Sequence, residues 1–140
     1  MTEMEYQAFE EARRKEHEKN AAHLTGFAEW LKHKGLSEKT IDKHVDNAAF
    51  YINEYLCRYE VLGVAQGCHE ISGFLGDWFI RKALWSSCAY IKSTAASIKK
   101  FYAFLLEEGL VTQDDYGELR DTIKDEMPDW LEEMQASDSI

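Results

Sequence analysis

Three lysines lie in a stretch of the chain that could bind phosphate groups. From Phe79 to Leu106 the sequence contains five basic residues and no acidic residue. The apolar residues of its second half recur at helical spacing, which places them on one face and the polar residues on the other. That outward face holds three lysines and two small serines: Lys92, Ser93, Ser97, Lys99 and Lys100. Its small, basic surface suits close approach by a phosphate backbone, although an ordinary solvated helix face would have the same composition.

An earlier stretch offers a second candidate face. Its polar residues follow one another at helical spacing: Lys39, Lys43, His44 and Asn47. The amide of Asn47 could hydrogen-bond a base edge, and either lysine could bind a phosphate. Both lysines alternate with Glu38 and Asp42, a pattern that is equally typical of a surface whose charges neutralise one another.

Arg81 and Lys82 form the third candidate group, at the end of a short predicted helix. Cations are favoured there because the last carbonyl groups of a helix carry partial negative charge. Helix capping is therefore the first interpretation of this pair, and phosphate binding is the second.

The sequence has no residue set that predicts catalysis. It lacks a glycine-rich phosphate loop, a nucleophile elbow and a paired-carboxylate motif. Its three cysteines, Cys57, Cys68 and Cys88, form no CxxC pair, and its five histidines form no HxxxH pair. We therefore expect that the protein is not an enzyme, has no catalytic residue and needs neither a cofactor nor a metal.

The cysteine count and the hydropathy indicate a compartment. An odd number of unpaired cysteines is typical of reduced thiols in a cytosolic protein. No apolar run approaches 18 residues and no charged-then-apolar leader opens the chain. The sequence thus predicts cytoplasmic localisation and no membrane association.

Helices must position these candidate residues. The sequence has only 1 Pro and 8 Gly, which favours long helices over a turn-rich β fold. Hydrophobic spacing, serine caps and terminal glycines predict two helices in the first half of the chain. The first runs from Tyr6 to about Lys34, has an exposed or frayed start and is ended by Gly35. The second is capped by Ser37 and runs from Glu38 to about Tyr59.

The same signals predict the second half of the chain. The first expected element is a short helix from Ile71 to near Ala83, followed by a helix that is capped by Ser86 or Ser87 and ended by Gly109. A short helix from Thr112 and a final turn or two opening at Pro128 come next. No structure is expected for Ala136–Ile140.

Two stretches resemble a known family. Residues 27–56 contain an ordered series that matches its first helical hairpin: Gly35, Leu36, Ser37, Thr40, Ile41, His44, Asn47 and Phe50. Residues 90–111 match the last helix of its second hairpin: Ile91, Ile98, Lys99, Phe101, Tyr102, Phe104, Leu105, Gly109 and Leu110. Over residues 20–112 the chain resembles the core-binding (SAM-like, N-terminal) domain of tyrosine recombinases and phage integrases.

The resemblance implies an all-α fold: a four-helix SAM-like core of two crossed helical hairpins, with a short acidic C-terminal helical extension. It implies a charged N-terminal arm over residues 1–20, the core-binding-like domain over 21–112 and the acidic tail over 113–140. In that family the domain is one jaw of a clamp around duplex DNA, and a separate C-terminal domain supplies the catalytic residues. Fewer than 30 residues follow Thr112, too few for such a domain.

Two departures lower the expected affinity for DNA. Ser93 and Thr94 stand where many relatives have paired arginines, and Asp42 and Asp46 lie on the second helix. Because each phosphate contact adds roughly −0.9 to the log–log salt slope, losing two arginines costs on the order of a hundredfold in affinity.

The net charge of −10 is concentrated in the tail. Residues 107–140 hold twelve acidic and two basic residues, whereas residues 1–106 are electrically neutral. This acidic stretch also carries Trp130 and Leu131, so it could form an amphipathic helix that docks on a partner or on the domain's own basic face. In the second case it would mask DNA binding, and removing residues 113–140 would raise the affinity for DNA.

These observations together predict a non-catalytic, weakly DNA-binding domain that contacts the backbone of duplex DNA. A recombinase or a regulatory protein is the expected protein partner. The alternative is a protein–protein interaction module with the same fold that has lost DNA binding.

Overall fold

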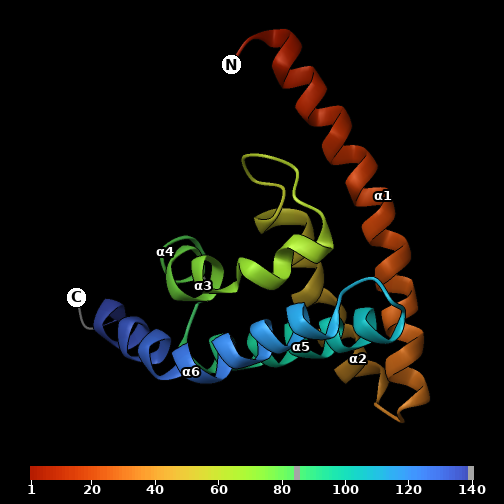
Figure 1. Ribbon diagram of the computed structural model, residues 1–140. Helices are drawn as coiled ribbons and strands as arrows, with labels where there is room; N and C mark the ends of the chain where they lie inside the picture. The colour runs from red at the N-terminus through yellow and green to blue at the C-terminus, as the bar shows by residue number, and fades with distance from the viewer. Residues whose placement is uncertain (84–85, 139–140) are drawn as a thin grey trace. The chain divides into compact units, whose positions relative to one another are not determined.

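The computed structural model describes residues 1–83 and 86–138, and every regular element in them is a helix (Figure 1). The predicted all-α class is therefore confirmed. The chain divides into two compact units, Met1–Gly67 and Cys68–Ile140. The predicted division into 1–20, 21–112 and 113–140 stays a prediction, although α1 (Glu3–His33) runs without interruption through residue 20.

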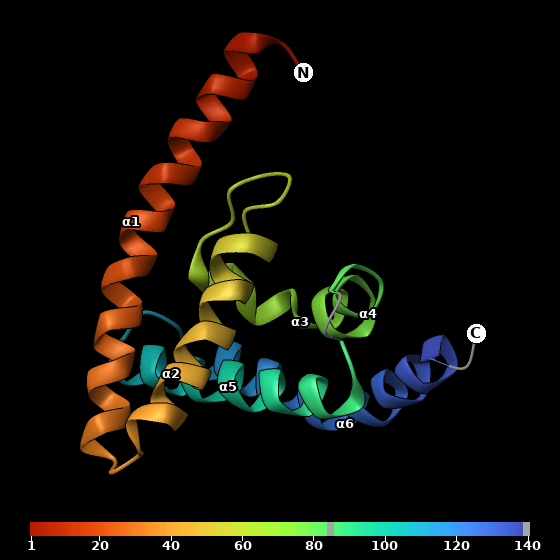
Figure 2. The ribbon, with the colours of Figure 1, turned by 180° about the vertical axis from the view of Figure 1, so that it is seen from behind.

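The first unit is built on a helical hairpin. Helix α1 begins at its N-cap Thr2, whose hydroxyl accepts the N–H of Glu5 at 3.1 Å. It ends as predicted at Gly35, where φ is +86°. The N–H groups of Gly35 and Leu36 donate to the carbonyls of Lys32 and Leu31, which satisfies the end of the helix. Helix α2 (Glu38–Ala49), capped by Ser37, then folds back on α1 (Figure 2).

The predicted continuation of α2 to Tyr59 is wrong. The α-helix ends at Ala49 and continues as a π-helix, η1 (Phe50–Tyr55), in which the N–H of Leu56 donates to the carbonyl of Tyr51. The wider turn is held from α1, because the buried amide of Asn20 donates to the Ile52 carbonyl at 3.4 Å and to the Asn53 side chain at 2.8 Å. A 3₁₀ helix, η2 (Val64–His69), follows the connecting loop.

The second unit starts with three short helical segments that follow one another directly. They are α3 (Ile71–Gly73), the π-helix η3 (Phe74–Trp78) and α4 (Phe79–Lys82), which together correspond to the short helix predicted from Ile71. Helix α5 (Cys88–Glu107) begins at Ser87 and is followed by Gly109, at φ +76°. Both of these boundaries agree with the sequence-based expectation.

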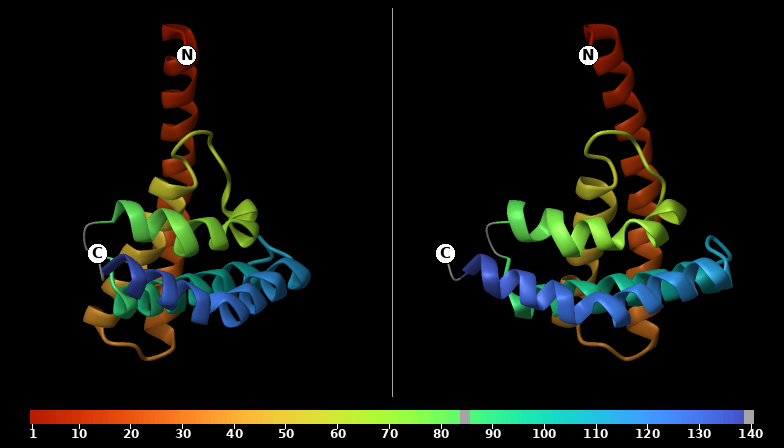
Figure 3. Two further views of the ribbon diagram at one scale, coloured as in Figure 1. Left: turned by 90° about the vertical axis from the view of Figure 1, so that its left-hand side faces the viewer. Right: turned by 60° about the vertical axis from the view of Figure 1, so that its left-hand side comes forward.

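Helix α6 (Gln113–Asp138) corrects the expected C-terminal region. The two separate short helices expected around Pro128 are one continuous helix, and residues 136–138 are helical (Figure 3); the expectation for residues 139–140 lies outside the described residues. Proline inside a helix costs about 3 kcal/mol. Here the buried side chains of Ile123, Trp130 and Met134 lie on both sides of Pro128, and their packing offsets that cost.

Helix α6 lies alongside α5 and also packs on α3, η3 and α4. The indole of Trp130 lies over Gly76, the hydroxyl of Ser72 donates to Glu126 at 2.9 Å, and the thiol of Cys88 lies 3.7 Å from the Leu131 carbonyl oxygen. The predicted tail is thus a packed helix of the second unit. No helix of the described ranges is long and apolar enough to span a lipid bilayer.

Candidate functional site

Helix α5 carries the first candidate face. The hydroxyl of Ser87 accepts the N–H of Tyr90 at 3.2 Å and so fixes the start of the helix. From there, nine residues are buried, including Ile91, Ala95 and Ile98, which were expected inside. Three lysines remain exposed and form what we term the lysine stripe: Lys92, Lys99 and Lys100.

Small residues separate these lysines. Ala89 and Ala96 are exposed and Ala103 is half-buried, at intervals of seven residues along the same side of the helix. A flat surface of methyl groups therefore lies between the amino groups. This geometry allows an extended anion to approach the helix closely while the lysines reach it from the sides.

Ser97 does not belong to this face. It was expected to point outward, but it is fully buried and its hydroxyl donates to the Ser93 carbonyl at 3.1 Å. Thr94 is also buried, and Ser93 is half-buried. The sequence pattern was misleading here because the buried side of α5 is wider than its apolar stripe and includes Thr94 and Ser97.

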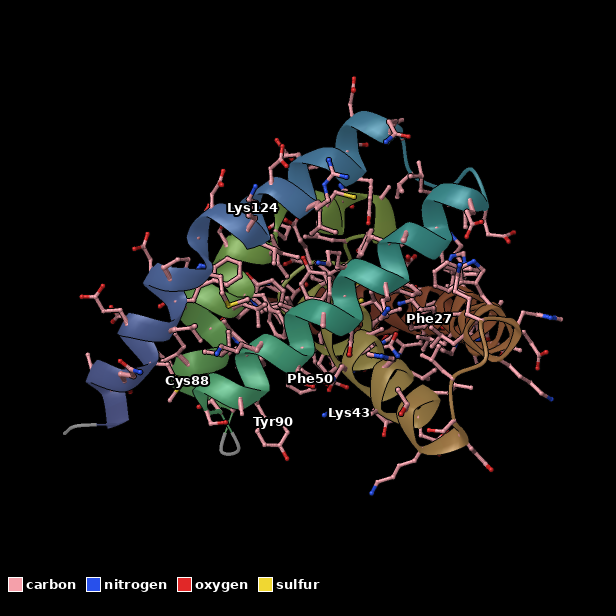
Figure 4. The ribbon with its side chains drawn as sticks, turned by 90° about the horizontal axis from the view of Figure 1, so that it is seen from below. Phe27, Lys43, Phe50, Cys88, Tyr90 and Lys124 are labelled. Carbon is pink, nitrogen blue, oxygen red and sulfur yellow. The ribbon has the colours of Figure 1, made fainter. Side chains whose placement is uncertain are left out.

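The lysine stripe lies in a basic stretch of the sequence. Between Asp77 and Glu107 the sequence has no acidic residue, and within the described part of the chain none of the three lysines takes part in an ion pair. Oxygen-tipped side chains project from the outer edge of α6 (Figure 4). Helix α6 packs beside α5 through apolar side chains and leaves the lysine stripe uncovered.

The candidate face on α2 is only partly accessible. Lys39 and Lys43 are exposed, whereas His44 and Asn47 are half-buried and engaged in contacts of their own. The two lysines are thus available to a phosphate. The base-edge contact proposed for Asn47 would require its side chain to leave its present contacts.

Arg81 is committed to an ion pair one turn away. Its guanidinium donates two hydrogen bonds to the carboxylate of Asp77, at 2.8 and 2.9 Å, and these bonds hold the pKa of Asp77 below its usual value. Lys82 is exposed at the last residue of α4. The arrangement around Arg81 favours the interpretation as a structural cation at the helix end.

The structure adds a cluster that the sequence did not predict. His69 lies between two carboxylates of α6, with Nε2 at 3.3 Å from Asp115 and Nδ1 in contact with Glu118. Burial, and then these two acids, raise the pKa of the neighbouring Cys68 thiol to about 12. No sequence signal links residues that lie 46 or more positions apart.

The cysteines and the cluster around His69 form no metal site in the described part of the chain. All three cysteines are free, with Cys57 and Cys68 buried and Cys88 half-buried. Among residues 1–83 and 86–138, no group of three or more His, Cys, Asp or Glu side chains is placed to hold a metal ion.

Comparison of the chain with protein-family models, with curated proteins and with solved structures gives no match.

Proposed function

We propose that the protein binds duplex DNA weakly, through backbone phosphates, and catalyses no reaction. The observation that carries this proposal is the lysine stripe, three exposed cations in an acid-free stretch of α5 with alanines between them. In the proposed arrangement the four central helices form the crossed hairpins of a core-binding-like domain. We further propose that the protein works in the cytoplasm beside a recombinase or a regulatory protein.

The expected binding mode follows from the residue types. Lysine is a flexible point charge and reads no base sequence when it contacts phosphates. Three phosphate contacts predict a log–log salt slope of roughly −2.7, since each contributes about −0.9. Binding should therefore be insensitive to base sequence and steeply dependent on salt.

A fluorescence titration with random-sequence duplex DNA tests the proposal. Between ~50 and ~200 mM salt the affinity should fall by roughly fortyfold, as a slope near −2.7 requires. The variant K92A/K99A/K100A should bind at least about tenfold more weakly at ~50 mM salt and lose most of its salt dependence.

The variant K15A/K19A/K32A is a matched control, because it removes three exposed lysines from α1. It should bind nearly as well as the wild type. Equal losses in both variants would mean that overall charge, and not the lysine stripe, drives binding. If the wild type does not bind at ~50 mM salt, the alternative of a protein–protein interaction module is favoured.

A further inference from the structure

We propose that α6 regulates the lysine stripe through its electrostatic field and not by covering it. This inference rests on the proposed DNA binding and assigns its control to the exposed acids of one neighbouring helix. It replaces the expectation that the acidic segment would lie on the basic face, because all three lysines are exposed with α6 in place.

Contacts within the second unit place the second half of α6 beside the start of α5. The Cys88 thiol, in the first turn of α5, lies 3.7 Å from the carbonyl oxygen of Leu131. Lys92 follows Cys88 by four residues, or about one helical turn. The acids around residue 131 therefore lie near the same end of α5 as the first lysine of the stripe.

Every charged residue in this half of α6 is acidic. After Lys124 the described chain has no further basic residue, and four acids there are exposed: Asp125, Asp129, Glu132 and Glu133. Trp130 and Met134 on the opposite side are buried, so the acids are held outward by the packing of the helix. They cannot turn away from a bound polyanion without unpacking α6.

The fixed acids must repel DNA phosphates that approach the lysine stripe. Such repulsion acts over roughly the Debye length, which is about 10 Å at 0.1 M salt and about 30 Å at 0.01 M. The acids therefore lower the affinity most at low salt and very little at high salt. A helix that blocked the stripe by contact would instead weaken binding at every salt concentration.

Deleting α6 would not test this idea, because the deletion would also expose the buried side of α5. Neutralising the acids while keeping the helix does test it, in the variant D125N/D129N/E132Q/E133Q. At ~20 mM salt this variant should bind random duplex DNA roughly tenfold more tightly than the wild type, and at ~300 mM less than about twofold.

A matched variant removes the same number of negative charges from exposed residues of the first unit: E3Q/E5Q/E29Q/E60Q. It should change the affinity by less than about threefold at ~20 mM salt. Helical circular dichroism and the thermal midpoint of each variant verify that it is folded. Should the α6 variant prove unfolded, E132Q/E133Q alone gives a smaller increase with the same salt dependence.

Two results would overturn the inference while leaving DNA binding intact. They are an unchanged affinity of the α6 variant at low salt, and an equal gain in both quadruple variants, which would indicate net charge alone. If neither the wild type nor either variant binds DNA at ~20 mM salt, the proposed function itself fails, and the inference fails with it.

Discussion

Gly76 of η3 lies directly against Trp130 of α6. A Cβ atom at this position would lie 2.7 Å from Nε1 and 2.9 Å from Cδ1 of Trp130. Such distances are too short for carbon contacts, so the buried indole would have to move. The absence of a side chain at residue 76 therefore determines how closely η3 and α6 approach.

We predict that Gly76→Ala destabilises the protein by about 1–3 kcal/mol through overpacking against Trp130. The free energy of unfolding in urea measures this change. Gly117→Ala is the control, because a Cβ there meets nothing within 4 Å and alanine is the better helix former. It should stabilise α6 by up to about 1 kcal/mol, and the same sign for both substitutions would contradict the packing argument.

Cys68 makes the stability depend on pH at the alkaline end. Burial, with the nearby charges of Asp115 and Glu118, raises its pKa from 9.0 to about 12. The folded protein therefore holds the thiol proton more tightly than the unfolded chain does. The resulting stabilisation is complete below pH 9 and is lost as the pH rises from 9 through about 12.

Urea unfolding at pH 8 and pH 10 tests this prediction. The wild type should lose on the order of 1 kcal/mol more than Cys68→Ala between these two pH values. Parallel losses in the two proteins would show that the thiol does not contribute.

Four helix boundaries are the residue-scale features that the sequence predicted well. Ser37 and Ser87 cap their helices, and Gly35 and Gly109 follow the ends of theirs with positive φ. These signals are local, since a cap bonds the backbone three residues away and only glycine adopts positive φ without strain. The burial of Ser97 could not be predicted in this way, because it depends on how many neighbours surround α5.

At the scale of elements, η1 is specified by a side chain from another helix. Asn20 is only 1% exposed, and its amide binds both the Ile52 carbonyl and Asn53. His17, also on α1, contacts the Asn53 carbonyl at 3.2 Å. The backbone carbonyls of Ile52 and Asn53 in η1 are thus hydrogen-bonded by side chains of α1.

Asn20→Ala should destabilise the protein by about 1–3 kcal/mol, because it removes the donor that binds the Ile52 carbonyl and the Asn53 side-chain oxygen. Chemical unfolding followed by circular dichroism measures the loss. Thr25→Ala is a suitable control on the same helix, since its exposed hydroxyl only donates to the Ala21 carbonyl, and it should change the stability by less than about 0.5 kcal/mol. A similar loss in both variants would argue against Asn20 as the determinant of η1.

The two π-helices and the continuity of α6 were beyond sequence reasoning for the same reason. Helical periodicity predicts that a segment is helical, but a π-turn depends on partners such as Asn20 that lie about 30 residues away. Pro128 predicted a helix start from local preference alone. Buried residues on both sides of it, Ile123 and Trp130, outweigh that preference.

At the scale of the whole molecule, the charge distribution follows the sequence closely. The neutral first 106 residues and the strongly acidic remainder are visible in the chain itself, and the exposed acids of α6 follow from them. The sequence did not reveal that this acidic region is also part of a hydrophobic core. Trp130 and Leu131 indicated an amphipathic helix, but their positions in the sequence do not say which surface its apolar side packs against.

A chain that ends at Thr112 should consequently lose the fold of the second unit. Removing residues 113–140 takes away four buried side chains, Leu119, Ile123, Trp130 and Met134, each worth about 1.5–3 kcal/mol. Circular dichroism should show a loss of helix larger than the deleted residues account for, together with binding of a hydrophobic dye.

Removal of residues 1–8 is the matching control, because all eight are exposed. This deletion should leave the thermal midpoint within a few degrees of the wild-type value. A stable, dye-free protein ending at Thr112 would show that α6 is dispensable for the core.

The place of α6 in the chain also orders events during synthesis. All residues of the first unit are available once residue 67 has emerged from the ribosome. The second unit cannot close its core until the residues around Trp130 and Met134 have been made. At about 5–20 residues per second, the apolar side of the nascent α5 therefore waits for seconds without its partner, an interval in which a chaperone has access to it.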